Sequence, residues 1–129
     1  MKKVLFVCGE NACRSQIAEA FSRIHGQGKI VADSAGSTPS GRVNPRAISL
    51  MREIGYDMNG HVSKSLDALP PVYYDYVITM GCQDACPFVP AIQRDDWGIP
   101  DPKDMDEEAF RQVRDLIEIK VLDLISKCT

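Results

Sequence analysis

The sequence has 129 residues, a formal net charge of −3 at pH 7 and 44% hydrophobic residues. This length suits one domain with its own core, and we expect a single domain over residues 1–129. The lack of a basic excess argues against a nucleic-acid partner. No apolar run reaches the length of a membrane span, and the one that follows Lys3 is too short for a signal peptide. We therefore expect a cytoplasmic protein with no membrane partner, and we expect it to be a monomer.

Strand and helix patterns alternate along the chain. Short apolar runs predict buried strands, whereas apolar residues at helical spacing predict helices. The expected strands cover residues 4–7, 29–35, 75–81 and a short segment near Ile92. The expected helices cover residues 13–25, 45–54 and a C-terminal segment after Asp104. This alternation predicts an α/β fold of three layers, an open parallel four-stranded sheet with helices on both faces.

Residues at the helix ends give finer predictions. Gly26 is expected to be the C-cap of the first helix. Asn44 is expected to be the N-cap of the second, just before Pro45 in its first turn. For the last helix we predict Asp104 as the N-cap, with Glu107 completing a capping box.

The segment that joins the first strand to the first helix has the layout of an anion site. Loop amides and the free N–H groups of a helix N-terminus can bind a negative charge. The predicted oxyanion-binding residues are Gly9, Glu10, Asn11, Ala12, Cys13, Arg14 and Ser15. The guanidinium of Arg14 matches two oxygens of a tetrahedral oxyanion.

Cys8 ends the first strand at this loop and is predicted to be a nucleophile. A thiolate is favoured at a helix N-terminus beside a cation, and Ser15 can donate a hydrogen bond to the sulfur. The alternative is that Cys8 is a buried core cysteine and Arg14 a surface residue of the helix. Cys13 is expected to pack, and nothing in the sequence requires His61 to take part.

A second pair of cysteines, Cys82 and Cys86, follows the third predicted strand. Five cysteines in a cytosolic chain favour nucleophilic or redox chemistry over a disulfide framework, and their spacing matches no zinc site. Because ligands bind at the carboxyl ends of parallel strands, Cys8 and Cys82 should lie along the same sheet edge. Three thiols then suggest a relay in which Cys8 attacks an oxyanion, Cys82 attacks Cys8, and Cys86 attacks Cys82. The alternative is that both are small buried hydrophobic residues.

Asp101 is the candidate general acid. A carboxyl group beside an oxyanion can protonate a leaving oxygen, and Pro102 stiffens the backbone that carries it. The alternative is a solvated turn aspartate, since Asp-Pro is a frequent turn pair.

Residues 8–19, C-G-E-N-A-C-R-S-Q-I-A-E, resemble the active-site signature of low-molecular-weight tyrosine phosphatases and of the arsenate reductases built on that fold. The similarity continues through residues 34–36, 43–48, 60–66, 75–80, 96–97 and 101–102. It implies a low-molecular-weight phosphatase-like fold and the following roles: Cys8 as nucleophile, Arg14 as oxyanion clamp, Ser15 as thiolate stabiliser, Asn11 as loop-shaping residue and Asp101 as acid.

Several residues resemble the reductase branch. Gln16 stands where phosphatases usually have proline, and Lys103 stands where they usually have an aromatic residue. Cys82 and Cys86 occupy the segment that carries the second and third redox cysteines of the reductases. The resemblance implies reduction of arsenate, with phosphate or sulfate as analogues, and no cofactor. It implies thioredoxin as reductant, with glutaredoxin as the other option.

Two other readings of the sequence remain open. The first is a phosphatase acting on phosphotyrosine or small phosphoesters, and the second is an oxyanion- or redox-sensing binding module.

The chain also departs from the pattern of the family that it resembles. Glu10 is unusual in an oxyanion loop. Asn11, Glu19 and Ser34 match a potassium site known in some of these reductases, but Lys64 replaces an expected acid. We expect the ammonium of Lys64 to replace the ion, and we expect no metal.

Overall fold

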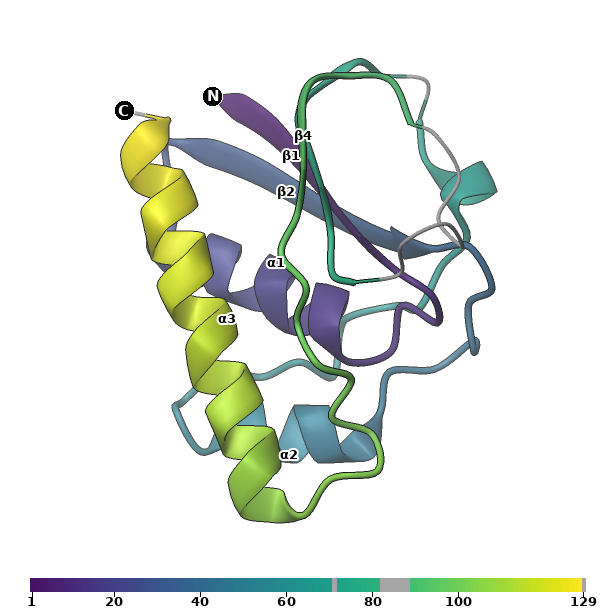
Figure 1. The fold of residues 1–129 in the computed structure, drawn as a ribbon, viewed down its shortest axis with the longest axis vertical. Coiled ribbons are helices and arrows are strands. Elements are labelled where there is room, and N and C mark those ends of the chain that lie inside the picture. Colours follow the sequence, from purple (N-terminus) through teal and green to yellow (C-terminus); the bar gives the residue numbers. More distant parts are fainter. Residues whose placement is uncertain (71, 82–88, 129) are drawn as a thin grey trace.

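The computed structural model describes residues 1–70, 72–81 and 89–128 (Figure 1). The strands are β1 (Lys2–Cys8), β2 (Ile30–Gly36), β3 (Tyr74–Thr79) and β4 (Ala91–Asp96). The helices are α1 (Arg14–His25), α2 (Pro45–Arg52) and α3 (Glu107–Lys127), with a short 3-10 helix, η1 (Leu66–Ala68). All neighbouring strands run parallel, in the order β2-β1-β3-β4. The predicted α/β class with an open parallel four-stranded sheet is confirmed.

β1 lies inside the sheet and carries the Cys8 loop at its carboxyl end. It pairs with β2 along its whole length, so that Cys8 lies opposite Gly36, and with β3 from Val4 to Val7. Its residues from Val4 onward are buried. A strand that is covered on both faces needs apolar residues at every position, which explains the unbroken run V-L-F-V-C.

The two faces of the sheet are covered differently. Val4 and Phe6 pack into the larger core with residues of α1, α2 and α3, and Figure 1 shows these three helices on one side of the sheet. Leu5 and Val7 face the other way, into a smaller core to which η1 and its flank contribute Leu66 and Leu69. Where helices were predicted on both faces, the described residues thus place the three α-helices on one face and the 3-10 helix η1 on the other. Among the described residues, no helix is both long and apolar enough to span a membrane.

Two of the three predicted helix caps are confirmed. Gly26 is the C-cap of α1, and Asn44 caps α2 by accepting a hydrogen bond from the backbone N–H of Arg46 at 2.9 Å. The third prediction is wrong: the N-cap of α3 is Asp106, not Asp104, and its Oδ1 accepts from the N–H of Ala109 at 2.8 Å. The reason is local, because the N–H of Met105 bonds to the carbonyl of Pro102 and keeps this part of the chain in a turn.

Replacing the cap of α3 is expected to destabilise the protein. Asp106→Ala removes the acceptor at Ala109 and should lower the free energy of unfolding by about 1 kcal/mol. Asp104→Ala is the matched control, with an expected change within about 0.5 kcal/mol. Urea denaturation of both variants measures the difference. Equal losses in the two variants would contradict the assignment of the cap.

Candidate oxyanion site

The sulfur of Cys8 is held at the first turn of α1. It lies 2.9 Å from the hydroxyl of Ser15, and both residues are buried. The side-chain amide of Asn11 donates to the same Ser15 oxygen at 2.8 Å. Because the amide occupies an acceptor site of that oxygen, the hydroxyl proton remains available for the sulfur. The Ser15 hydroxyl is thus positioned to donate a hydrogen bond to the sulfur of Cys8.

The loop between Cys8 and α1 presents free backbone donors. Its carbonyls are tied to the chain that follows β2: the N–H groups of residues 38, 40 and 44 donate to the carbonyls of residues 9, 10 and 12. In contrast, none of the N–H groups of residues 10–13 donates to another described residue, and the N-cap of α1 has no side-chain capping bond. Unpaired amides at a helix N-terminus need an external acceptor, which an anion supplies.

Two backbone positions shape this loop. Asn11 adopts a φ of 50°, the left-handed region that asparagine tolerates better than most residues. At Gly36 an added Cβ would lie 2.6 Å from the carbonyl oxygen of Gly9, so a side chain at the end of β2 would displace the loop. Within the segment 34–36 singled out in the sequence, Gly36 therefore matters because it has no side chain.

Arg14 links the loop to the ends of two other segments. Its Nη1 donates to the carbonyls of Met80 at 2.8 Å and Ile99 at 2.9 Å. Its Nη2 lies 3.8 Å from Oδ2 of Asp101, which is partly exposed. The guanidinium is thus anchored by one nitrogen, while the other faces a carboxylate at the mouth of the site.

These groups enclose a cavity of about 140 Å³. It is lined by Cys8, Gly9, Glu10, Ala12, Cys13, Arg14, Asn44, Asp101 and Lys103. The structure therefore brings the predicted nucleophile, clamp and acid together, while Asn11 and Ser15 are buried beneath the loop. Cys82 and Cys86 lie outside the described residues.

Cys13 is buried, as expected from the sequence. Removal from solvent raises the pKa of its thiol to about 12. At neutral pH Cys13 is therefore a neutral thiol, which is not a nucleophile.

A chain of buried polar side chains supports Asn11, and no sequence pattern predicted it. Gln16 donates to the side-chain and backbone oxygens of Asn11 at 2.9 and 3.1 Å. The Gln16 oxygen, which can only accept, lies 3.0 Å from Nδ1 of His61. The proton of His61 is therefore on Nδ1, and Nε2 accepts from the hydroxyl of Tyr56 at 2.7 Å. His61 is a neutral member of the network, and burial lowers its pKa.

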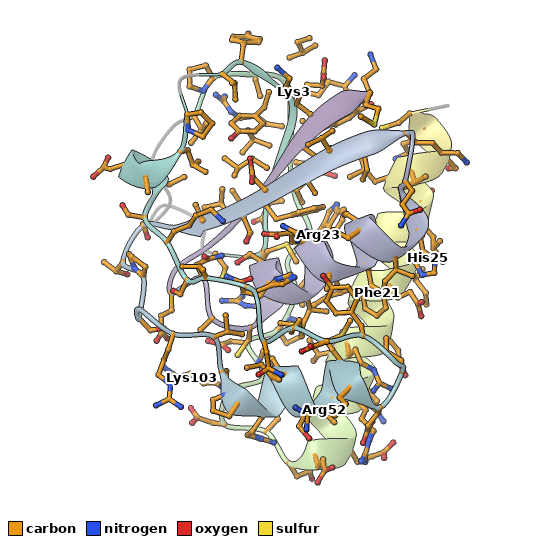
Figure 2. All side chains as sticks on the ribbon, turned by 180° about the vertical axis from the view of Figure 1, so that it is seen from behind. Lys3, Phe21, Arg23, His25, Arg52 and Lys103 are labelled. Carbon is orange, nitrogen blue, oxygen red and sulfur yellow. The ribbon has the colours of Figure 1, made fainter. Side chains whose placement is uncertain are left out.

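The carboxylate of Glu19 is paired with Arg23. Its oxygens accept from Ser34 Oγ and from Arg23 Nη2, each at 2.6 Å; Figure 2 shows Arg23 on α1, beside β2. Lys64 contacts Asn11 through its backbone, since its N–H donates to Oδ1 of Asn11 at 2.9 Å. The cation that meets Glu19 is therefore Arg23, which the sequence analysis did not identify.

The fold and the site define an α/β protein with a cysteine at the base of an oxyanion cavity. The family model described as "Low molecular weight phosphotyrosine protein phosphatase" matches residues 3–128. This chain belongs to that family, and the resemblance inferred from residues 8–19 is confirmed.

Relatives with known names point to one branch of the family. A protein of Synechocystis sp. named glutaredoxin arsenate reductase is 42% identical over 98% of both chains. A solved structure of an arsenate reductase in the phosphate-binding state is 39% identical over 100% of both chains, with a TM-score of 0.90. The thioredoxin-dependent arsenate reductase of Corynebacterium glutamicum is 30% identical, with a TM-score of 0.80, over 99% of this chain and 62% of that one.

The buried His61 should make stability depend on pH. Because its folded-state pKa lies below the ordinary value, the unfolded chain binds a proton more readily than the folded chain does. The free energy of unfolding should therefore fall as the pH is lowered from about 7 to 5. His61→Gln should reduce the slope of the free energy of unfolding against pH by the equivalent of up to one bound proton. Urea denaturation at several pH values measures this slope. An unchanged slope would show that His61 is not held neutral.

Proposed function

We propose that this chain reduces arsenate to arsenite by a cysteine relay and serves arsenic detoxification as a cytoplasmic, single-domain monomer. One observation carries the proposal: the chain that leaves β3 toward Cys82 passes the oxyanion site. Arg14 Nη1 binds the carbonyl of Met80, and a Cβ added at Gly81 would lie 3.4 Å from the same nitrogen. Gly81 directly precedes Cys82. The names of the relatives from Synechocystis sp. and Corynebacterium glutamicum support the same reaction.

The first step uses the oxyanion site. Arsenate enters the cavity as an anion and is bound by the free loop amides and by Arg14. The Cys8 thiolate attacks arsenic and forms a sulfur–arsenic bond. Asp101, which lines the same cavity, acts as a carboxylic acid and donates its proton to the leaving hydroxyl of arsenate, so that water departs and Asp101 becomes a carboxylate.

The second and third steps move electrons between sulfur atoms. The Cys82 thiolate attacks the sulfur of Cys8, a disulfide forms, and the sulfur–arsenic bond breaks with its electron pair left on arsenic. Arsenic is thereby reduced from the +5 to the +3 state and leaves as arsenite. The Cys86 thiolate then attacks Cys82, which releases the Cys8 thiolate and leaves a Cys82–Cys86 disulfide.

A thiol protein must return two electrons and two protons to that disulfide. We propose thioredoxin as this reductant, with glutathione and glutaredoxin as the alternative. Relatives of both kinds support the wider statement that a thiol protein is the partner, since one is named for glutaredoxin and one is described as thioredoxin-dependent.

Hydrolysis of phosphomonoesters is the second candidate function. Phosphate and arsenate share shape and charge, so Cys8, Arg14 and Asp101 can serve either reaction. Hydrolysis needs only the Cys8 thiol, because water, rather than Cys82, then attacks the covalent adduct. Arsenate reduction therefore requires Cys82, whereas hydrolysis does not.

The proposal predicts different fates for two activities of one variant. Cys82→Ser should lower arsenate turnover by at least about a hundredfold, because the adduct is no longer resolved by a thiol, while weak hydrolysis of p-nitrophenyl phosphate survives. Cys8→Ser should remove both activities, and Cys128→Ser is the control that should keep both. Arsenate-dependent NADPH oxidation is followed with thioredoxin and its reductase, and in parallel with glutathione and glutaredoxin. Wild-type arsenate turnover in Cys82→Ser would exclude the relay.

A further inference from the structure

The side chains of Glu10 and Lys103 meet at the open end of the Cys8 cavity. Nζ of Lys103 lies 3.1 Å from Oε2 of Glu10, and both residues line the cavity. The two side chains are about half exposed (47% and 49%), whereas Cys8 is only 3% exposed. The ion pair thus lies toward solvent and the sulfur at the base. Figure 2 shows Lys103 at the surface, on the side of the molecule where α2 lies.

The backbone at the Glu10 end of this pair is anchored. The carbonyl of Glu10 accepts from the N–H of Ser40 at 3.0 Å and from the hydroxyl of Ser63 at 3.1 Å. These bonds come from two segments that are far from Glu10 in sequence. Movement of the Glu10 side chain is therefore limited to its own rotamers.

The backbone at the Lys103 end is anchored as well. The N–H of Lys103 donates to Oδ1 of Asp101, and its carbonyl accepts from Nη1 of Arg46, both at 3.1 Å. Arg46 belongs to α2, and its Nη2 also binds the carbonyl of Met105. The two side chains therefore span a gap whose width is set by fixed backbone on either side.

We propose that Glu10 and Lys103 form a latch that makes the cavity selective for small inorganic oxyanions over organic phosphomonoesters and phosphonates. This inference rests on the proposed function, since it takes the Cys8 cavity to be the place where the oxyanion binds. A tetrahedral oxyanion without a substituent fits beneath the closed pair. The organic group of a bound ester must extend out of the cavity at its open end. There it separates Glu10 from Lys103 and places apolar surface against their two charges.

The charge and strength of the pair suit this role. Its net charge is zero, so the latch does not repel an incoming anion as Glu10 alone would. Hydrogen bonding to Glu10, together with the charges of Glu10, Asp101 and Asp104, raises the pKa of Lys103, so the pair favours the ammonium form that lysine ordinarily has at neutral pH. An ion pair between half-exposed side chains is weak, so it opens easily when an anion passes.

Binding of two ligands that differ in one substituent on phosphorus, a hydroxyl in phosphate and a phenyl ring in phenylphosphonate, tests the proposal. Isothermal titration calorimetry with inorganic phosphate and with phenylphosphonate, which cannot be hydrolysed, gives the ratio of their Kd values. The double variant Glu10→Gln/Lys103→Met removes the latch without changing net charge. Its preference for phosphate over phenylphosphonate should fall up to about fivefold relative to the wild type, the factor that separating a weak, half-exposed ion pair can supply. The reversed pair, Glu10→Lys/Lys103→Glu, should restore most of the preference.

A second ion pair on the same molecule provides a matched control. Asp123 and Lys127 on α3 are 3.2 Å apart and exposed, and neither lines the Cys8 cavity. Asp123→Asn/Lys127→Met should leave the ratio unchanged. The latch is excluded if the Glu10/Lys103 double variant gives the same ratio as this control, or if the wild type binds neither ligand or both equally.

The calorimetric test is independent of turnover. A wild type that selects phosphate but does not reduce arsenate would overturn the proposed function and leave the latch in place. A protein that reduces arsenate but shows the same ratio with and without the pair would overturn the latch alone.

Discussion

The hydrogen bond between Ser15 and Cys8 joins the end of β1 to the first turn of α1, and the rest of the site is arranged around it. A sulfur in this position faces the positive end of a helix and free backbone donors. The geometry depends on two constraints of the fold: β1 must lie inside the sheet so that Cys8 is buried, and Gly36 must leave room for the loop. A side chain at position 36 would displace the loop and so change the surroundings of Cys8.

The polar residues behind the loop make this arrangement rigid. Asn11 holds Ser15, Gln16 holds Asn11, and His61 holds Gln16. Each donor in the series has an acceptor, so the network satisfies groups that would otherwise be buried without a partner. Because the Gln16 oxygen at the end of this series can only accept, the proton of His61 is on Nδ1. The candidate oxyanion site is thus supported by neutral hydrogen bonds on its buried side.

Local patterns predicted the parts of the molecule that depend on neighbours in sequence. The strand, loop and helix around Cys8 follow from an apolar run and a change to helical spacing, and Asn44 caps its helix just before Pro45 as expected. The prediction of Asp104 as the N-cap failed because aspartate at either position can cap a helix, and a turn involving Met105 starts the helix after Asp106.

Contacts between distant segments could not be predicted in this way. Gln16 meets His61, and Glu10 meets Lys103, only once the chain has folded, and no spacing rule links such positions. Arg23 lies one helical turn after Glu19, so that pair was in principle visible from i,i+4 spacing. The family resemblance drew attention instead to Lys64, whose backbone, rather than its ammonium, contacts Asn11.

The proposed relay depends on a disulfide that forms between Cys8 of the oxyanion site and Cys82 of the segment after β3. Mass spectrometry of Cys86→Ser after a single turnover with arsenate, without any reductant, tests this most directly. The relay predicts one arsenite released per molecule and a disulfide between Cys8 and Cys82. Arsenite formation with Cys82 still a free thiol would contradict it.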